Sequence, residues 1–321
     1  MACPRRRYLE RCGRVGGALG LGVLAGCTGN EPADENRATI RIGSKPFPEQ
    51  EILGYLAYER LQGVAGLTVV DEIGYGNSLA NWTATANGEK HLYWEYTGTA
   101  WTQLPPRHET RVSDPDRLFE RVQSDARSQG LRMADPASFS NEYVIVVDQA
   151  WAGQLGISTL TDLFEYVAEA PAEIGVALNE EFYHRNDGWA QLFSYYDVDD
   201  GVRSSLESGT FIVTSVGLTY ELLNRDGIHV ASGFATDPQL DRSGLMTVTD
   251  DREYFRPYQP APTAYAPIIE SQPTVFEALA PVVDALDESV MRSLNRRVLF
   301  DDRLPSAVAR RFLSESGVPD V

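Results

Sequence analysis

The side chains with the greatest potential for chemistry gather in one stretch, residues 93–101. It contains four large aromatic residues, two threonine hydroxyls and one carboxylate around a single glycine. Alternation through Trp94 and Tyr96 predicts a strand, and the Thr-Gly-Thr at 97–99 predicts a turn. An aromatic ring at a strand end, followed by hydroxyls, suits a ligand that needs both a π-face and hydrogen-bond donors. The same pattern is also typical of a core strand, because aromatic side chains are usually buried.

A second chemical candidate is one of the few lysines. Lysine occurs only at positions 45 and 90. Lys45 follows a predicted strand at 38–43, and Ser44 stands where a helix cap is expected. A helix N-terminus favours an anionic group, and ligands of open α/β sheets bind at the carboxyl ends of strands. Lys45 and residues 97–99 are therefore expected to face one crevice. The alternative is a solvated surface lysine.

The elements that must position these residues follow from hydrophobic periodicity. After the strand at 38–43, a helix at 49–63, a strand at 67–73, a helix at 79–87 and the aromatic strand follow in order. This alternation predicts an α/β lobe with a mainly parallel sheet. Downstream we expect strands at 143–147, 173–178 and 228–234, a return to the first lobe at 245–248, a proline-punctuated loop at 254–258, and helices at 160–168, 274–286, 288–298 and 305–316.

The charge balance excludes some partners. The chain carries a net charge of −18, and five arginines and one glutamate before Cys27 give that segment +4, which leaves −22 for the rest. Such an acidic surface repels nucleic acid and anionic lipid headgroups. Abundant acidic residues with scarce lysine predict a halophilic protein, because salt screens the self-repulsion. An ordinary acidic protein would show the same composition.

The N-terminus reads as a targeting segment. Residues 1–27 combine a twin-arginine start at Arg5 and Arg6, a short apolar run and Leu-Ala-Gly-Cys ending at Cys27, which predicts a signal peptide with a lipobox and lipidation of Cys27. Residues 28–37 are predicted to be a flexible tether. The two other cysteines precede Cys27, so no disulfide, metal cluster or thiol nucleophile is expected in the folded body.

Several short motifs, in order, resemble those of the osmoprotectant-binding proteins, the substrate-binding proteins of ABC importers for glycine betaine, choline and related quaternary amines. The similarity covers residues 38–315. The motifs are Ser-Lys-Pro-Phe-Pro-Glu-Gln at 44–50, Asn-Gly-Glu at 87–89, Glu-Tyr-Thr-Gly-Thr at 95–99, Asn-Glu-Tyr at 141–143, Glu-Phe and Arg-Asn-Asp-Gly at 181–188, Gly-Leu-Thr-Tyr at 217–220, Thr-Asp at 236–237, and Arg-Pro-Tyr with Pro-Ala-Pro at 256–262.

The resemblance implies a two-lobed periplasmic-binding-protein fold of type II with a hinged cleft. Lobe one is expected at 38–138 and 245–321, and lobe two at 139–244. It also implies no cofactor and no metal. The protein would be lipid-anchored outside the cytoplasm and would deliver its ligand to a membrane permease that works with a separate ATPase subunit.

The resemblance further implies the ligand site. An aromatic box for the trimethylammonium group is carried over to Tyr96, Tyr143 and Tyr258, with Phe234 at a corner where the family commonly has tyrosine. Aromatic faces suit this group because it cannot donate a hydrogen bond and spreads its charge over methyl groups. The residues expected to meet a ligand carboxylate are Lys45, Thr99 and Arg185. Two cations there favour a zwitterion such as glycine betaine over choline.

Other functions stay open at this point. Choline, carnitine or another small solute such as an amino acid are alternative ligands, although an amino acid's ammonium needs carboxylate acceptors. A lipid-anchored interaction module without a small ligand is a further alternative. An enzyme is disfavoured, since the four histidines lack metal-ligand spacing and no nucleophile elbow, P-loop or dinucleotide motif occurs. Arg185 is also expected to pair with Asp187 or Glu181 if its role is structural.

Overall fold

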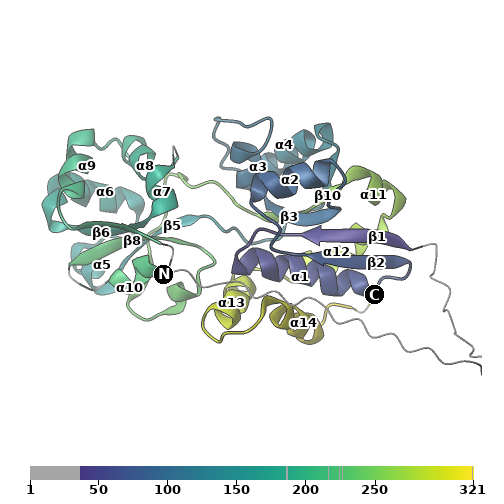
Figure 1. Cartoon of the computed structure of the whole chain (residues 1–321). Coiled ribbons are helices and arrows are strands. Elements are labelled where there is room, and N and C mark those ends of the chain that lie inside the picture. Colours follow the sequence, from purple (N-terminus) through teal and green to yellow (C-terminus); the bar gives the residue numbers. More distant parts are fainter. Residues whose placement is uncertain (1–36, 186, 216, 224, 226, 320) are drawn as a thin grey trace, which may run out of the picture. The chain divides into compact units, whose positions relative to one another are not determined.

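The protein is described by a computed structural model that covers residues 37–185, 187–215, 217–223, 225, 227–319 and 321. The predicted signal peptide, the lipidated Cys27 and residues 28–36 of the tether lie outside these residues. Within them, two five-stranded sheets are each flanked by helices (Figure 1). The α/β class predicted from the sequence is confirmed.

The first sheet has the spatial order β2-β1-β3-β10-β4. Strand β1 runs parallel to β2 and β3, whereas β10 runs antiparallel to β3 and β4. Helix α1 connects β1 to β2, and α2 connects β2 to β3, as parallel neighbours require. The strands are β1 (Ala38–Gly43), β2 (Leu67–Glu72), β3 (Leu92–Tyr96), β4 (Leu131–Met133) and β10 (Pro260–Tyr265).

The second sheet repeats this arrangement in the order β7-β6-β8-β5-β9. Strand β6 runs parallel to β7 and β8, and β5 runs antiparallel to β8 and β9. The strands are β5 (Tyr143–Asp148), β6 (Gly175–Asn179), β7 (Phe211–Thr214), β8 (Ile228–Phe234) and β9 (Leu245–Thr247). The register of β5 and β8 places Tyr143 directly opposite Phe234.

Both sheets of the described residues are therefore mixed: four strands of each run in one direction, in keeping with the predicted mainly parallel sheets, and the strand in the fourth position runs against them. In each sheet the strand in the fourth position enters from the other sheet. Strand β5 follows β4 of the first sheet, and β10 follows β9 of the second sheet. Because each of these strands arrives from the other sheet and not through a local crossover helix, its direction is not tied to that of its neighbours, and it pairs antiparallel.

Helices flank both sheets, and they are grouped into a first part, which belongs to the first sheet, and a second part, which belongs to the second sheet. In the first part these are α1 (Pro48–Gln62), α2 (Ser78–Ala86), α3 (Thr97–Gln103), α4 (Pro115–Ser128), α11 (Ala266–Ser271), α12 (Thr274–Asp284), α13 (Glu288–Leu299) and α14 (Pro305–Glu315). In the second part they are α5 (Gln149–Leu155), α6 (Leu160–Glu169), α7 (Glu180–His184), α8 (Trp189–Tyr195), α9 (Asp200–Glu207) and α10 (Leu218–Leu222), with short 3₁₀ turns η1 (Pro171–Glu173) and η2 (Pro238–Asp241).

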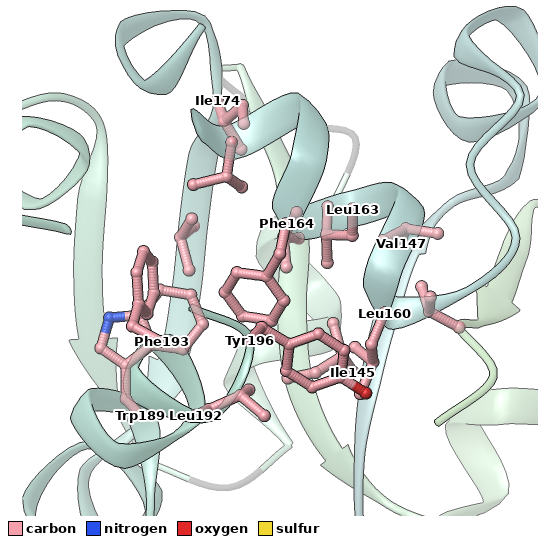
Figure 2. Packing of buried hydrophobic residues seen from close by; sticks show 14 of the residues in the cluster. Ile145, Val147, Leu160, Leu163, Phe164, Ile174, Trp189, Leu192, Phe193 and Tyr196 are labelled. Atoms are coloured by element: carbon pink, nitrogen blue, oxygen red, sulfur yellow. The ribbon is translucent and has the colours of Figure 1, made fainter. Parts of the chain in front are cut away.

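The second sheet encloses an aromatic core. Phe164 stacks on Tyr196 and meets Phe193 edge to face, with ring centroids 4.9 and 5.0 Å apart. Figure 2 shows these rings between α6, α8 and the sheet, with Trp189 and Leu192 beside them. These side chains are buried and serve packing, which anchors α6 and α8 on the sheet.

Two local predictions next to the candidate ligand residues are corrected by the structure. Ser44 is not a helix cap, because α1 starts at Pro48, where proline's fixed backbone angle suits the first helical position. Ser44 Oγ instead accepts a hydrogen bond from the Gly74 amide at 2.9 Å. Residues 97–99 form the first turn of α3 and not a separate turn.

The predicted return to the first lobe at 245–248 is also wrong. Leu245–Thr247 forms β9 and pairs with β5, and Val248 and Tyr254 belong to the core of the second sheet. The chain rejoins the first sheet only at β10, which the sequence analysis missed. Its prolines, Pro260 and Pro262, mask a strand because proline cannot donate to a ladder. Their carbonyls bond to Ala137 and Ala134, beyond the end of β4, so no partner strand needs the missing N–H groups.

The close approach at Gly233 gives a stability prediction. A Cβ atom at this position of β8 would overlap the Tyr220 phenol, which donates to Asp237 at 2.7 Å. We expect Gly233→Ala to lower the free energy of unfolding by about 2 kcal/mol, because the overpacked ring must move. Chemical denaturation measures this. Gly153→Ala is the matched control, since no heavy atom lies within 4 Å of a Cβ there. Equal losses in both variants would contradict the assigned contact.

Candidate functional site

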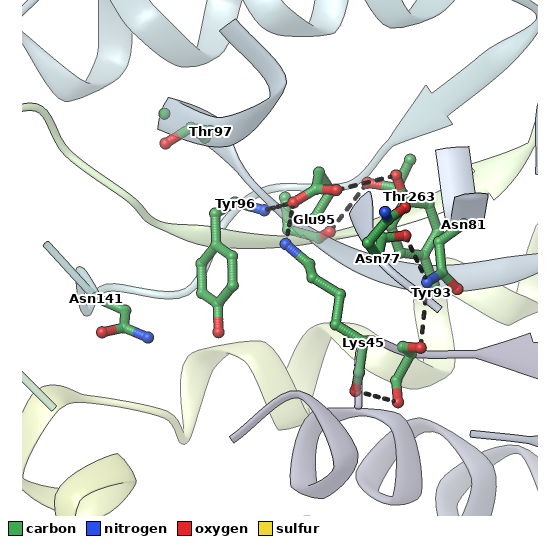
Figure 3. Close-up of polar contacts among 12 residues, drawn as sticks. Lys45, Asn77, Asn81, Tyr93, Glu95, Tyr96, Thr97, Asn141 and Thr263 are labelled. Atoms are coloured by element: carbon green, nitrogen blue, oxygen red, sulfur yellow. Dashed lines mark hydrogen bonds and ion pairs between the residues drawn. The ribbon is translucent and has the colours of Figure 1, made fainter. Parts of the chain in front are cut away.

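Lys45 lies in a buried ion pair on the first sheet. Its Nζ is 2.5 Å from Glu95 Oε1 and 4.4 Å from the centroid of the Tyr96 ring. Figure 3 shows the lysine reaching from the segment after β1 to the end of β3. The Lys45 side chain is 8% exposed and that of Glu95 is fully buried, so Lys45 is not a solvated surface lysine.

Glu95 changes what Lys45 can offer to a ligand. Its Oε1 also accepts from the Tyr96 amide at 2.8 Å, and its Oε2 from the Tyr93 hydroxyl at 3.3 Å. The lysine charge is thus already matched by a carboxylate. The sequence gives no sign of this pairing, because Lys45 and Glu95 are 50 residues apart. Only the formation of the sheet brings the two side chains together.

Tyr96 is held at its hydroxyl by a second buried carboxylate. The phenol donates to Glu49 Oε1 at 2.7 Å, and Phe47 lies parallel to the ring with centroids 6.5 Å apart. Burial raises the pKa of both groups, that of the Tyr96 phenol well above its ordinary value. Glu49 was not singled out from the sequence, although its spacing to Ile52, Leu53 and Leu56 puts it on the buried face of α1.

On the second sheet, three aromatic rings form one cluster. Tyr143 contacts Phe234 at a centroid distance of 4.6 Å and Phe182 at 4.8 Å. Tyr143 is 6% exposed, and its hydroxyl has no hydrogen-bond partner within the described part of the chain. Desolvation raises the pKa of this phenol, with a smaller contribution from the charge of Glu181. An unpaired buried hydroxyl beside aromatic faces is unusual and marks a place where a ligand or water can bind.

Arg185 lies beside this cluster, immediately after α7. Its guanidinium carbon is 5.5 Å from the Tyr143 ring centroid. Both oxygens of Asp187 accept from it, at 2.8 and 3.0 Å, and Glu181 accepts at 3.1 Å. The structural pairing considered in the sequence analysis is therefore present. Arg185 Nη2 also donates to the Tyr258 hydroxyl at 2.8 Å, which a purely local ion pair would not require.

Asp187 serves two arginines. Arg256 Nη1 approaches its Oδ2 at 2.6 Å, so Arg185 and Arg256 share one carboxylate. Although burial opposes the change, the hydrogen bonds and charge of Arg185 lower the pKa of Asp187. The remaining partner, Glu181, has a side chain that is 66% exposed, and such a pair contributes little. The two arginines are thus formally balanced by two carboxylates, of which Glu181 is largely solvated.

Tyr258 joins the two parts of the site. Its backbone amide donates to Ser140 Oγ at 2.8 Å, and its carbonyl accepts from the Asn141 amide at 3.0 Å. Its ring lies so close to Gly98 that a Cβ there would be 2.8 Å from Tyr258 Cε1. The first turn of α3, which carries Thr99, is thus next to the ring. The Thr99 side chain is half-buried.

The structure brings the seven predicted residues into two networks. Tyr143, Phe234, Arg185 and Tyr258 form one chain of contacts, and Lys45 and Tyr96 form the other, with Thr99 next to the Gly98–Tyr258 contact. Asn141 links the networks, because its side-chain amide donates to Glu49 Oε1 at 2.9 Å. A cavity of about 500 Å³ on α7–α9 includes Arg185 alone of the seven.

Other site types find less support. In the part of the chain that is described, no group of three or more histidine, cysteine, aspartate or glutamate side chains is arranged to hold a metal ion. The helices of that part are also too short or too polar to cross a membrane. The arrangement offers aromatic faces next to guanidinium groups, which suits a cation joined to an anion.

Comparison with known proteins shows the family to which the chain belongs. Residues 38–315 match the model of the substrate-binding domain of ABC-type glycine betaine transport systems. The glycine-betaine-binding protein of Pseudomonas aeruginosa is 30% identical, with 88% of this chain and 89% of that protein covered. The substrate-binding protein CosB of a chemotactic signal transduction system in Halobacterium salinarum is 29% identical, with 81% and 79% covered.

Solved structures agree on the fold. Apo YehZ from Escherichia coli superposes with a TM-score of 0.70 at 23% identity, covering 88% of this chain and 100% of that one. A protein described as a glycine betaine/carnitine/choline ABC transporter gives a TM-score of 0.72 at 22% identity, covering 86% and 98%. The two mixed sheets are thus those of a two-lobed periplasmic binding protein, and the chain belongs to the family of substrate-binding domains of ABC-type glycine betaine transport systems.

Proposed function

We propose that this protein captures a quaternary ammonium osmoprotectant outside the cytoplasm, glycine betaine or a similar zwitterion, and delivers it to an ABC permease that works with a separate ATPase subunit. The observation that carries the proposal is the aromatic cluster of Tyr143 and Phe234 directly beside the Arg185 guanidinium. The ligand leaves chemically unchanged, so the protein acts as a carrier and not as an enzyme.

The chemistry of the two ends explains why this cluster suits a betaine. Methyl groups that share a positive charge are attracted to ring faces, by about 0.5–2 kcal/mol for each ring depending on desolvation. The carboxylate at the other end of the ligand would meet the guanidinium groups of Arg185 and Arg256, since the Glu181 side chain that also pairs with Arg185 is exposed and screened by solvent. Arg256 Nε has no hydrogen-bond partner within the described residues, so it is a donor that an anion would satisfy.

The proposed box draws on both lobes. We propose that each sheet with its helices is one lobe, with the crossings near residues 139–142 and 255–259. Lys45, Tyr96 and Thr99 then belong to lobe one, and Tyr143, Arg185 and Phe234 to lobe two. Tyr258 lies on the returning crossing. Closure of one lobe on the other would bring Tyr96 toward the Tyr143–Phe234 pair and complete the box.

The relatives widen the range of ligands to be tested. The carnitine transport binding protein OpuCC of Listeria monocytogenes is 24% identical over 295 residues. One superposed structure is a choline-binding protein with choline bound, at a TM-score of 0.55. Choline and carnitine are therefore the alternative ligands, and an amino acid remains a more distant one. Choline lacks the carboxylate that the arginine pair would attract.

A titration panel tests the proposal. We expect isothermal titration calorimetry to show binding of glycine betaine and carnitine, weaker binding of choline and none of glutamate. The reason is that only the first two join a trimethylammonium group to a carboxylate. A chain that binds glutamate better than glycine betaine would contradict the aromatic box.

The polarity of the site is tested at Arg185. We expect Arg185→Ala to weaken glycine betaine by about 10–100-fold, the loss of a hydrogen bond to a charged group, and to change choline affinity much less. Arg203→Ala is the matched control, because Arg203 lines the same cavity but pairs with Glu207 and Asp200. Equal losses of betaine and choline affinity on Arg185→Ala would show that Arg185 does not meet the carboxylate.

CosB favours a second candidate function. Its similarity and the scarcity of lysine in this acidic chain fit a halophilic protein that reports its ligand to a chemotactic system. The two roles share the binding step and differ in the protein that receives the loaded form. Uptake of labelled glycine betaine by a strain that lacks the protein separates them: lost uptake supports transport, and normal uptake with lost chemotaxis supports signalling.

We propose further that residues 1–27 are a twin-arginine signal peptide with a lipobox and that Cys27 carries the lipid anchor. We expect Cys27→Ala to release the protein from the membrane fraction of cells that export it, because the acyl chains are its only proposed anchor. Membrane fractionation and immunoblotting measure this. Cys12→Ala, inside the removed segment, is the control that should stay membrane-bound. Retention of both variants would contradict the lipobox.

A further inference from the structure

The buried carboxylate of Glu49 contacts groups that lead to ring walls on both sheets. On one side, the Tyr96 hydroxyl donates to Oε1 at 2.7 Å. On the other, the Asn295 side-chain amide on α13 donates to Oε2 at 2.8 Å and to the Thr236 carbonyl at 3.1 Å. Thr236 lies two residues after Phe234, at the end of β8. Glu49 is thus one hydrogen bond from Tyr96 and two from the segment that holds Phe234.

Neighbouring contacts strengthen the link to the second sheet. Arg292, one helical turn before Asn295, donates to the Ala235 carbonyl at 2.8 Å. Asn141 donates to Glu49 Oε1 at 2.9 Å and precedes Tyr143 by two residues. The segments that carry Tyr143 and Phe234 are therefore both attached to the Glu49 network. A shift of either segment relative to Glu49 would therefore strain or break these hydrogen bonds.

The geometry requires an acceptor at Glu49. Side-chain donors from Tyr96, Asn141, Asn295 and Thr236 face its two oxygens, and an ionised carboxylate has only acceptor sites. Protonation would turn one oxygen into a donor and leave fewer acceptor sites for these groups. A glutamine would do the same permanently with its amide nitrogen. The carboxylate is 3% exposed and has no ion pair with the described residues.

We infer that Glu49 is a positioning residue that fixes the Tyr96 ring relative to Phe234 and thereby sets the affinity for the quaternary amine. The inference rests on the proposed function, since the two rings are walls of the proposed box. Glu49 itself does not touch the ligand. Its effect is transmitted through the Tyr96 hydroxyl and through Asn295 to the end of β8.

A pH dependence follows from the same contacts. Burial raises the pKa of Glu49 above its ordinary value of 4.5, hydrogen bonds from Thr236, Tyr96 and Asn295 oppose the rise, and the charge of Asp237 adds to it. As the pH falls through this raised pKa, the carboxylate gains a proton and the network loses an acceptor. Affinity for choline, which has no carboxyl group of its own, is therefore expected to fall with it.

Asp237 and Tyr96 are the titratable groups facing Glu49. Burial also raises the pKa of Asp237, which accepts from the Tyr220 hydroxyl and the Phe234 amide. Tyr96 stays protonated throughout, because its pKa is raised well above 10.0. Glu49 and Asp237 are therefore the two groups whose contributions to an acidic loss of affinity must be separated.

The experiment measures the affinity of the wild-type full chain and its variants for glycine betaine and choline between about pH 5 and pH 8. We expect Glu49→Gln to weaken both ligands about tenfold at the upper pH, the loss of one hydrogen bond to a charged group. We expect it to abolish the acidic fall in choline affinity. The thermal midpoint is measured in parallel, because the variant removes a buried charge but also leaves a buried donor without an acceptor.

A second variant decides the question if Glu49→Gln does not fold. Tyr96→Phe keeps the ring and removes the hydroxyl, so it breaks the same bond and should cost the same factor. In the double variant the two losses should not add, because both act on one contact. The control is Glu51→Gln on the same helix. Burial raises the pKa of that carboxyl too, but it is outside the network, so affinity and pH profile should match the wild type.

Each outcome decides the inference. Unchanged affinity in Glu49→Gln or Tyr96→Phe would overturn it, as would an acidic fall that persists in Glu49→Gln, which would assign the titration to Asp237. A lower thermal midpoint with unchanged affinity would reduce Glu49 to a structural role. If the wild type binds neither ligand, the proposed function fails first, and that result is distinguishable because it precedes any variant.

Discussion

The hydrogen bonds between the two chain crossings are the constraint on which the rest of the structure depends. The Tyr258 amide donates to Ser140, and its carbonyl accepts from Asn141. These bonds hold the segment that leads into β5 beside the segment that leads into β10. The same segments carry Tyr258 and lead to Tyr143. The proposed ligand residues Tyr143 and Tyr258, far apart in the sequence, thus have fixed positions where the chain passes between the sheets.

Charge pairing then determines what the site can attract. Lys45 is neutralised by Glu95 inside the first sheet, whereas Arg185 and Arg256 share Asp187, and the second partner of Arg185, Glu181, is largely solvated. A buried cation with a matched carboxylate orients its neighbours but offers little net field, and a pair of arginines on one carboxylate offers more. In the proposed site, the attraction for a ligand carboxylate therefore comes mainly from the arginines, and Lys45 chiefly fixes the Tyr96 side of the box.

Buried amides and hydroxyls around Tyr96 complete this division of roles. Hydrogen bonds of Glu49 to Asn141 and Asn295 join the elements that carry these residues, while the Tyr96 ring face is the proposed binding surface. Such networks cost stability if one member is left unpaired, and they define relative positions more sharply than apolar packing does. The Tyr143 hydroxyl and Arg256 Nε, both without partners in the described part of the chain, are the complementary case. They are groups that a bound ligand or water would satisfy.

The sequence by itself determined the α/β class, most helices and parallel strands, and the family, because periodicity and motif order are local properties. Local patterns also predicted the aromatic strand and the amphipathic terminal helices. Only the tertiary structure decided that β9 belongs to the second sheet and that proline-rich β10 is a central strand, since strand pairing depends on distant neighbours. It likewise decided that Lys45 meets Glu95 and that Glu49 joins Tyr96 to Asn295. Contacts between residues 50 or 246 positions apart leave no periodic signal in the chain that forms them.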